Sequence, residues 1–251
     1  MFTLNLPTVA VLPESALLDS AAARKEVYLE LAELAEGRQM KPKAAFEHTV
    51  AALKEVPRDL DVEGSFNVNA LISSKEQRRM DTFMQYGLVA ADLAIEDSGW
   101  DPQNDESYER TGVLIGSGIG GLPAIEKSAS LVSDGNLRRL SPFFIPSSLI
   151  NLVSGHVAIN HGFKGPNHAV VTACSSGAHA IGDAARMIMW EDAEVMIAGG
   201  AEAAICKLGV HGFAQAKALS TSFNDTPSKA SRPWDKDRDG FVIGEGAGVV
   251  V

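Results

Sequence analysis

The chain has 251 residues, of which 45% are hydrophobic and 22% are charged, and this composition is typical of a globular protein with one large or two small domains. Its formal net charge of −10 argues against nucleic-acid binding, because neutralising phosphates requires a basic surface. No apolar run approaches the roughly 18 residues of a membrane span, and two cysteines cannot build a disulfide framework or a four-thiolate metal site.

The first 63 residues predict a helical pair without recognisable chemistry. Residues 16–37 are rich in Ala, Leu and Glu, and Pro42 can begin a second helix that Pro57 would end. The N-terminus lacks the basic start and long apolar core of a secretory signal, which favours the cytoplasm. We therefore treat residues 1–63 as an unassigned helical segment and expect the function to lie in residues 64–251.

From residue 64 onward, predicted helices alternate with short strands. Ser74 and Gln77 are spaced as a capping box that opens a helix, and Gly99 is placed to end it. Short apolar runs at residues 111–115, 168–172 and 195–198 predict strands, the last of them ending at two glycines. Within the first helix an apolar and small-residue stripe has helical spacing: Phe83, Gly87, Ala90, Ala91, Ala94 and Ile95.

A further helix is expected directly after Cys174, and residues 241–251 predict a final strand. The alternation of strands and helices predicts an α/β fold with a largely parallel sheet and helices on its faces. Because the final strand has no polar exit, we expect the chain to be part of a longer protein; the alternative is a natural C-terminal strand at a sheet edge. The helix after Cys174 has one side made of Ala178, Ile181, Gly182, Ala185, Ile188 and Met189.

The most informative segment is the stretch 168–177, HAVVTACSSG, in which an apolar strand leads into Cys174 and then into a helix. Small residues allow a sharp turn, and the positive end of the helix dipole favours the nucleophilic thiolate. The N–H groups of the first helical turn lack partners within the helix, so one of them can donate to an oxyanion. This pattern predicts a site for acyl transfer. The alternative is that Cys174 is a small buried hydrophobe, and Cys206, without a comparable turn, is interpreted as structural.

Seven segments, in order along residues 64–251, carry a family resemblance: residues 74–81 (SKEQRRMD), 116–121 (GSGIGG), 141–146 (SPFFIP), 172–177 (TACSSG), 198–202 (AGGAE), 218–220 (ALS) and 231–248 (SRPWDKDRDGFVIGEGAG). Together they resemble the beta-ketoacyl-acyl-carrier-protein synthases, in particular the type II elongating condensing enzymes of bacterial fatty-acid synthesis. The resemblance implies that residues 64–251 are the N-terminal half of such a synthase. It also implies a thiolase-like α/β fold, in which two similar halves pack around a layer of helices.

The resemblance further implies a ping-pong reaction in which Cys174 takes an acyl group from a carrier-protein thioester. Malonyl carrier protein then loses carbon dioxide, and its carbanion attacks the acyl-cysteine to give a 3-oxoacyl carrier protein. No metal or redox cofactor is implied. The implied partners are acyl carrier protein, in its acyl and malonyl forms, and a second copy of the chain in a homodimer.

Three residues are implied to contact the acyl chain, and plain core packing is the alternative for each. Ile119 would border the acyl pocket, Phe213 would line the approach to the thiol, and Phe144 would lie at the base of the tunnel near the dimer interface. Six basic residues match carrier-protein contacts: Lys75, Arg78, Arg79, Arg138, Arg139 and Lys217. The first three oppose the dipole of the helix they begin, which favours a partner over the alternative of solvated surface charge.

Two features depart from the family pattern. The two histidines, the lysine and the phenylalanine loop that complete the family's site belong to its second half, and none of the six histidines here lies in a matching motif. His179, five residues after Cys174, is expected to point away from the sulfur. In addition, residues 1–63 lack the apolar strand and Thr-Gly-Leu-Gly turn with which members open. The chain alone is therefore expected to hold the acyl nucleophile without completing the condensation.

Other interpretations of these motifs remain. The GSGIGG segment fits the dinucleotide pattern GxGxxG, but residues 128–139 read as a polar loop and not as the second strand that this fingerprint needs. The aspartates in residues 232–239 suggest a metal site, but the interleaved cations favour an internal salt-bridge loop. The functional alternatives are a non-catalytic homologue or partner subunit, against which the cysteine of TACSSG counts, and another thiolase-fold cysteine acyltransferase, against which the RPWD segment counts.

Overall fold

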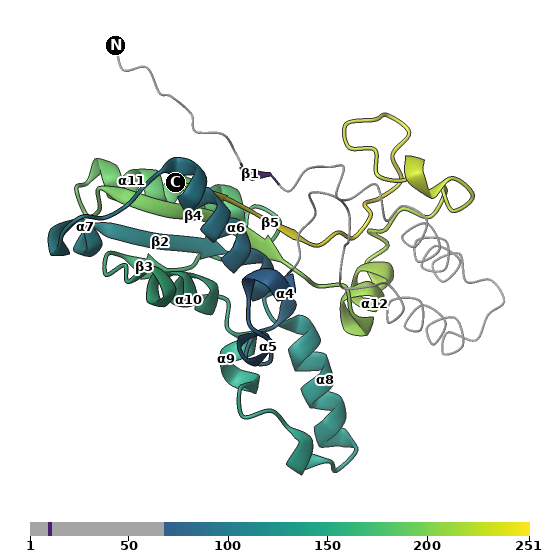
Figure 1. Cartoon of the computed structure of the whole chain (residues 1–251). Coiled ribbons are helices and arrows are strands. Elements are labelled where there is room, and N and C mark those ends of the chain that lie inside the picture. Colours follow the sequence, from purple (N-terminus) through teal and green to yellow (C-terminus); the bar gives the residue numbers. More distant parts are fainter. Residues whose placement is uncertain (1–9, 12–67) are drawn as a thin grey trace. The chain divides into compact units, whose positions relative to one another are not determined.

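The structure is a computed structural model, and it describes residues 10–11 and 68–251 (Figure 1). The helices expected between residues 16 and 57 lie outside the described residues. The chain divides into two compact units. Of the described residues, the first unit contains 10–11, 69–204 and 245–251, and the second contains Val68 and 205–244.

The described part of the first unit is built on a five-stranded sheet with the order β1-β5-β4-β2-β3. Strand β2 is parallel to both β3 and β4, whereas β5 is antiparallel to β4, and β1 is antiparallel to β5. Four of these five described strands therefore run in one direction, which confirms the expected α/β fold with a mostly parallel sheet. The strands are β1 (Ala10–Val11), β2 (Thr111–Gly116), β3 (Asn167–His168), β4 (Val195–Glu202) and β5 (Gly246–Val250).

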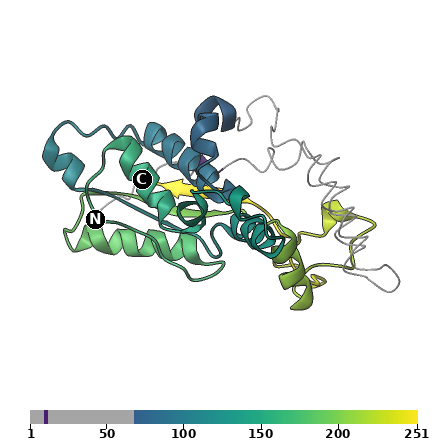
Figure 2. The same ribbon diagram turned by 90° about the horizontal axis from the view of Figure 1, so that it is seen from below.

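Helices cover both faces of this sheet (Figures 1 and 2). On one face, α6 (Thr82–Ser98) packs against β4 and β5, and α10 (Leu152–His161) packs against β2 and β3. On the other face, α11 (Ser176–Met189) packs against β2 and β4. The other helical elements that the structure describes before residue 204 are α4 (Val68–Leu71), α5 (Ser74–Gln77), α7 (Asp105–Glu109), α8 (Leu122–Ser133), η1 (Leu137–Arg139) and α9 (Phe144–Ser148).

Helix α6 has the C-terminal end and the buried face that the sequence predicts, but it begins at Thr82 and not at Ser74. The Asp81 carboxylate accepts the N–H of Thr82 at 2.6 Å, and its other oxygen accepts the N–H of Ala124 in α8 at 2.7 Å. Gly99 ends the helix in the left-handed region, with φ of 66°. The predicted stripe from Phe83 to Ile95 is buried.

The short helix α5 begins one residue earlier than predicted, with Ser73 as its N-cap residue. The Ser73 hydroxyl accepts the N–H of Glu76 at 3.3 Å and donates to the Glu76 carboxylate at 2.6 Å. Gln77 donates instead to the carbonyl of Ile72 at 2.7 Å. The prediction of a box from Ser74 to Gln77 is wrong, because a carboxylate three residues after Ser73 is the stronger acceptor for its hydroxyl.

Strand β3 ends at His168, so the strand predicted for residues 168–172 is wrong beyond its first residue. In a continued parallel ladder, the N–H of Ile115 on β2 would donate to the carbonyl of His168. The hydroxyl of Ser154 from α10 stands between them, accepting from Ile115 and donating to His168, both at 2.9 Å. One side chain from the covering helix therefore ends the strand and frees the backbone that follows for a turn.

Strand β4 runs through Gly199 and Gly200 to Glu202, so the prediction that it ends at these glycines is wrong. A Cβ on Gly199 would lie 2.0 Å from the carbonyl oxygen of Gly248 on β5. A Cβ on Gly200 would lie 2.9 Å from the Cα of Gly177 on α11. The glycines therefore permit neighbouring backbones to approach closely and do not form a turn.

The helix predicted after Cys174 is α11, and its small residues Ser176, Ala180 and Ala184 are buried against the sheet. The predicted side with Ala178, Ile181, Gly182, Ala185, Ile188 and Met189 is the exposed one in the described part of the chain. The predicted final strand is confirmed only as β5. Phe241 instead donates to the carbonyl of Ala218 and accepts from the N–H of Ser220, both at 3.0 Å, within the second unit.

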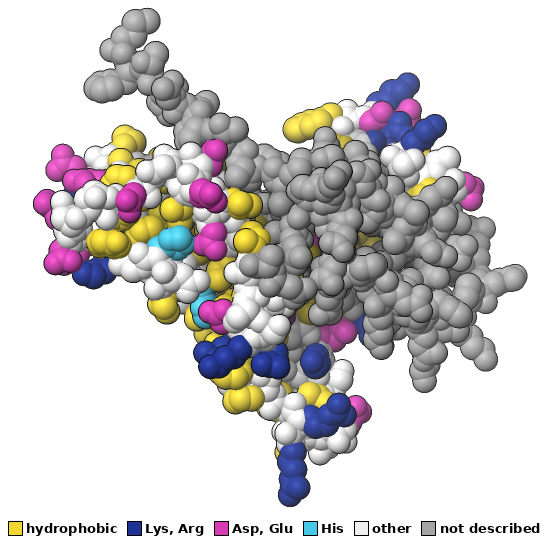
Figure 3. Space-filling model, in the orientation of Figure 1, with side chains coloured by type: hydrophobic (Ala, Val, Ile, Leu, Met, Phe, Trp, Pro, Cys, Tyr) yellow, Lys and Arg dark blue, Asp and Glu magenta, His cyan; other side chains and the backbone are white. Residues whose placement is uncertain are grey.

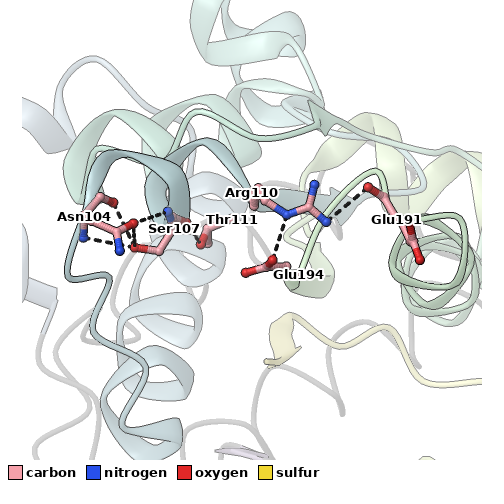
Figure 4. Close-up of polar contacts among 6 residues, drawn as sticks. All are labelled: Asn104, Ser107, Arg110, Thr111, Glu191 and Glu194. Atoms are coloured by element: carbon pink, nitrogen blue, oxygen red, sulfur yellow. Dashed lines mark hydrogen bonds and ion pairs between the residues drawn. The ribbon is translucent and has the colours of Figure 1, made fainter.

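The amino ends of the parallel strands are joined by polar contacts near the surface (Figure 4). Asn104 and Ser107 form a reciprocal capping box on α7, which leads into β2. The Arg110 guanidinium contacts the Glu194 carboxylate at 2.9 Å, immediately before β4, and the carbonyl of Glu191 at 3.2 Å. Thr111 donates back to the carbonyl of Ser107 at 2.6 Å, so this end links α7, β2 and the approach to β4.

The second unit, as far as it is described, contains α12 (Lys207–Gln215) and η2 (Pro227–Lys229). Asp239 joins two of its loops, accepting the hydroxyl of Ser220 at 2.6 Å and the N–H groups of Thr221 and Ser222 at 2.8 and 2.7 Å. Burial acts to raise the pKa of Asp239, but these hydrogen bonds outweigh it and hold that pKa well below its usual range. The carboxylate form is therefore part of the loop structure.

Candidate active site

Cys174 is exposed and lies at the point where the chain leaves the sheet and enters α11. Ser175 is the N-cap residue of that helix, so the sulfur is carried by the residue immediately before the cap. The predicted helix after Cys174 is present as α11, but the predicted strand directly before it is not, because β3 ends at His168. The alternative that Cys174 is a buried hydrophobe does not hold for the described structure.

The turn around Cys174 is closed by its own serines. The Ser176 hydroxyl accepts the N–H of Thr172 at 2.9 Å and donates to the carbonyl of Ala173 at 2.7 Å. The Ser175 hydroxyl donates to the carbonyl of Thr172 at 2.7 Å. Ala173 has φ of 51°, in the left-handed region that non-glycine residues rarely adopt. These bonds hold a strained backbone and fix the direction in which Cys174 leaves the turn.

Two N–H groups of the same turn are already satisfied within it. The N–H of Ser175 donates to the carbonyl of Thr172 at 3.2 Å, and the N–H of Ser176 donates to the carbonyl of Ala173 at 3.1 Å. Neither one is therefore the oxyanion donor that the sequence analysis expected in the first helical turn. The turn at Ala173 is the physical reason, because it folds those carbonyls back onto the start of the helix.

The glycine loop after β2, residues 116–121, is held by Glu202 at the end of β4. One carboxylate oxygen of Glu202 accepts the N–H of Gly118 at 2.7 Å and the N–H of Ile119 at 3.1 Å. The other accepts the hydroxyl of Ser117 at 3.0 Å, and the Ser117 oxygen in turn accepts the N–H of Gly120 at 3.0 Å. Glu202 lies in the segment 198–202 that carries the family resemblance, but its contact with the glycine loop was not predicted.

The glycine loop and the Cys174 turn are in direct contact. A Cβ on Gly118 would lie 3.1 Å from the carbonyl oxygen of Ala173, and a Cβ on Gly116 would lie 2.9 Å from the carbonyl oxygen of Ser176. The two turns therefore pack backbone against backbone at the carboxyl ends of β2 and β4. Open α/β sheets bind their ligands at this edge.

In this arrangement, backbone N–H groups of the glycine loop that a dinucleotide would need are already hydrogen-bonded within the protein. A pyrophosphate would need the N–H groups that the loop presents, but those of Gly118 and Ile119 are taken up by the Glu202 carboxylate. Residues 128–133, which were read as a polar loop, are the last part of α8, and the described chain does not place the expected second strand there.

His179 contacts the turn from the first part of α11. Its Nδ1 lies 3.3 Å from the Thr172 hydroxyl, and its Nε2 lies 3.2 Å from the Asp183 carboxylate one turn further along the helix. The ring thus links the residue two positions before Cys174 to α11. The sequence predicted only that the ring points away from the sulfur. It did not predict this contact with Thr172.

The three residues predicted to contact the acyl chain are distributed over both units. Ile119 is half-buried in the glycine loop, so its backbone neighbours the Cys174 turn. Phe144 is half-buried at the start of α9 in the first unit. Phe213 belongs to α12 of the second unit, where its ring packs edge-on against Phe241 with centroids 5.1 Å apart. Of the three, Ile119 is the one that directly follows Gly118, whose added Cβ would lie 3.1 Å from the Ala173 carbonyl oxygen in the Cys174 turn.

Five of the six predicted carrier-protein contacts are exposed on the first unit. Lys75, Arg78 and Arg79 lie on α5 and directly after it, and Arg79 stacks over the ring of Phe143 at 5.1 Å. Arg138 and Arg139 are exposed in η1, after α8. Dark-blue side chains gather where α5, α8 and α9 lie (Figure 3). The sixth residue, Lys217, is exposed in the second unit.

Other features of the described residues bear on the remaining alternatives. Cys206 is the half-buried N-cap residue of α12, so it too lies at the start of a helix, but without the left-handed turn that precedes Cys174.

The Asp235 carboxylate contacts Arg232 at 3.0 Å and accepts the N–H of Asp237 at 2.8 Å, which supports a salt-bridge loop. Among the described residues no metal-holding cluster of three or more His, Cys, Asp or Glu is found, and no helix there is long and apolar enough to cross a membrane.

Comparison with curated proteins places this site in a family context. 3-Oxoacyl-[acyl-carrier-protein] synthase 2 of Rhizobium meliloti is 58% identical over 189 residues, which are 75% of this chain and 45% of that protein. The mitochondrial 3-oxoacyl-[acyl-carrier-protein] synthase of Arabidopsis thaliana is 54% identical over 188 residues, which are 75% of this chain and 40% of that protein. The chain thus spans less than half the length of these relatives.

Solved structures show the same thiolase-like fold. A beta-ketoacyl synthase from Burkholderia phymatum superimposes with a TM-score of 0.64 at 31% identity, covering 74% of this chain and 45% of that one. A second match is a chain of the solved complex described as a type II PKS acyl-carrier protein with its ketosynthase bound to the hexaketide. It superimposes with a TM-score of 0.62 at 27% identity, covering 69% of this chain and 43% of the matched chain.

The sequence profile described as "Beta-ketoacyl synthase, N-terminal domain" matches residues 29–251, so it begins within the segment that the sequence analysis left unassigned. The match includes the strand–cysteine–helix turn, the glycine loop and the strand that ends at Glu202. On this evidence, the chain belongs to the beta-ketoacyl synthase family.

Proposed function

We propose that this chain is the acyl-accepting part of a 3-oxoacyl-[acyl-carrier-protein] synthase that acts in fatty-acid elongation. The observation that carries the proposal is the exposed Cys174 at a strand-to-helix turn on the carboxyl edge of a mostly parallel sheet. Relatives that are 46–58% identical over three quarters of the chain bear the name of such synthases, which supports the same assignment.

In the first half of the proposed reaction, the Cys174 thiolate attacks the carbonyl carbon of an acyl thioester on the carrier protein. A new carbon–sulfur bond forms to Cys174, the bond to the carrier sulfur breaks, and the carrier leaves as its thiolate. Cys174 directly precedes Ser175, the N-cap residue of α11, and so lies near the positive end of that helix's dipole. No cofactor enters this exchange, because one thioester replaces another.

In the second half, malonyl carrier protein loses carbon dioxide, and the electron pair of the broken bond attacks the acyl-cysteine carbonyl. A carbon–carbon bond forms, the bond to Cys174 breaks, and the product is a 3-oxoacyl carrier protein. The two histidines that the family uses here match no residue of this sequence. We therefore assign to the residues in hand the uptake of the acyl group, and the condensation to the whole protein.

The acyl chain is proposed to run past Ile119, with Phe144 and Phe213 as further contacts. For Ile119 the support is its place in the loop that touches the Cys174 turn. For the other two the support is the family match, because Phe213 lies in the second unit and Phe144 at the start of α9. The family match is also the support for including a homodimer and a cytoplasmic location in the proposal.

The proposed carrier docks on the basic residues of α5 and η1, assisted by Lys217. The support is their exposure and the gathering of positive charge near α5, α8 and α9, on a chain whose net charge is −10 (Figure 3). A local basic face on an acidic protein steers an acidic partner to one orientation. The solved relative whose carrier protein is bound to its ketosynthase supports this kind of partner.

The non-catalytic alternative is disfavoured, because Cys174 is present and exposed and the relatives are named as synthases. The test is intact mass spectrometry after mixing the chain with an acyl-carrier thioester. We expect an adduct of one acyl group that is absent in Cys174→Ala and retained in Cys206→Ala. An unmodified wild-type chain, or an adduct that persists in Cys174→Ala, would contradict the proposal.

A further inference from the structure

We propose that Glu202 is a positioning residue, which fixes the glycine loop and thereby sets Ile119 beside the Cys174 turn for acyl-chain selection. The inference rests on the proposed function, because it concerns the chain that Cys174 would carry. It begins with an unusual placement, since Glu202 ends a strand whose preceding residues are almost all buried and apolar.

The Glu202 carboxylate takes up three donors of one loop. Gly118 and Ile119 donate their N–H groups to one oxygen, and the Ser117 hydroxyl donates to the other. Because hydrogen bonds to an ionised carboxylate are about twice as strong as neutral ones, this set determines the conformation of the loop. A loop with several glycines has little conformational preference of its own, so it needs such an external constraint.

The same loop is pressed against the nucleophile turn. Gly118 has no room for a Cβ, which would lie 2.8 Å from the Glu202 Oε2 and 3.1 Å from the Ala173 carbonyl oxygen. Ile119 follows Gly118, and Cys174 follows Ala173, so these side chains leave from adjoining points of contact. A displacement of the loop therefore moves Ile119 relative to the sulfur.

Substitution of Glu202 by Gln tests the positioning with little change in size. The amide leaves one acceptor oxygen for three donors and turns an NH₂ group toward the backbone N–H groups. Glu194→Gln is the matched control, because it removes the same charge just before the other end of β4, where Glu194 meets Arg110. Ser117→Ala is a milder second variant, which removes one of the three donors.

The first readout is amide hydrogen exchange in the Cys206→Ala chain. We expect the N–H groups of Gly118 and Ile119 to exchange about tenfold faster or more in Glu202→Gln, and Ser117→Ala to act in the same direction. Glu194→Gln should leave them unchanged. If exchange of these N–H groups is unaltered in both loop variants, the positioning role is contradicted. If Glu202→Gln does not fold, the exchange rates in Ser117→Ala decide the question.

The second readout is the alkylation rate of Cys174 with iodoacetamide and with its N-octyl derivative. We expect the wild-type preference for the octyl probe to fall about tenfold in Glu202→Gln, because a displacement of about 1 Å can cost up to about 10²-fold. The iodoacetamide rate should change much less. If the octyl preference is kept in Glu202→Gln but lost in Ile119→Ala, the role of Glu202 is contradicted and the proposed function is not. If the wild-type chain accepts no acyl group from its carrier, the proposed function itself is contradicted.

Discussion

The amino ends and the carboxyl ends of β2 and β4 carry different kinds of polar contact. At the amino ends, Arg110 and Glu194 pair near the surface, where each side chain remains partly open to solvent. At the carboxyl ends, the Glu202 carboxylate is bound by backbone N–H groups of a glycine loop that itself touches the Cys174 turn. The first arrangement joins elements, and the second fixes backbone positions.

The two ends also differ in charge. Figure 3 shows magenta side chains mostly at the end of the sheet where α7 lies, and dark-blue ones over α5, α8 and α9. Exposed acids at the α7 end include Asp97, Asp101, Asp105, Glu106 and Glu109. This distribution would repel the proposed acidic carrier from the α7 end and attract it toward the other. The contacts at the amino end join structural elements, whereas the proposed chemistry depends on the carboxyl end.

The largest effect is expected from Gly116→Ala at the carboxyl end of β2. The added Cβ would lie 2.8 Å from the carbonyl oxygen of Val170 and 2.9 Å from that of Ser176, and neither backbone group can yield easily. We expect a loss of about 2 kcal/mol in the free energy of unfolding and a clear change in the alkylation rate of Cys174.

The control for that change is Gly182→Ala on α11, where an added Cβ has no neighbour within 4 Å. It should stabilise the chain by roughly 0.5–1 kcal/mol through helix propensity. Urea unfolding and iodoacetamide kinetics measure both variants. Equal stabilities of the two glycine variants would break the claim that the carboxyl end depends on close backbone packing.

The next effect is expected from reversing two charges of the basic face. Arg78→Glu with Arg79→Glu should slow acyl transfer from the carrier protein by about tenfold at low salt, because steering is lost. Added salt should reduce the difference in acyl-transfer rate between the wild type and this double variant. The rate of iodoacetamide alkylation of Cys174 should be the same in both. Lys164→Glu, near Asp105 at the acidic end, is the control. An equal slowing in the control would contradict a localised docking face.

A smaller effect is expected from Asn104→Ala at the amino end. The substitution removes the cap of α7 and should cost about 1 kcal/mol of unfolding free energy. The alkylation rate of Cys174 should be unchanged, because the cap lies at the opposite end of β2. A slower Cys174 in this variant would show that the two ends are coupled.

The smallest effect concerns acid, and it falls outside both ends of the sheet. The pKa of Asp239 is lower in the folded chain than in the unfolded one, so its stabilising effect is present above about pH 4 and is lost as the pH falls. Asp239→Asn should therefore lower the melting temperature at pH 7 and lower it less at pH 3. A difference that grows on acidification would contradict the hydrogen bonds assigned to this carboxylate.

The parts of the fold that the sequence predicted are those determined locally. The apolar spacing of α6 and its end at Gly99, the buried run of β2 and the junction at Cys174 all follow from patterns within a few residues. The prediction of α11 was right for the same reason. The thiolase-like fold was predicted from the order of the family segments.

The parts that were missed depend on contacts distant in sequence. The end of β3 is set by the Ser154 hydroxyl, which belongs to a covering helix, and β4 continues through its glycines because Gly248 and Gly177 approach them. The role of Glu202 is of this kind. An acidic residue at the end of an apolar strand is the available signal, but its partners lie about 85 residues earlier in the sequence.

Tandem mass spectrometry of the acylated chain decides whether Cys174 is the acyl acceptor, because it locates the acyl group on a peptide. After reaction with an acyl-carrier thioester and digestion, we expect the acyl group on Cys174, at the carboxyl end of the sheet. Acylation of Cys206 in its place, or of no cysteine, would contradict it.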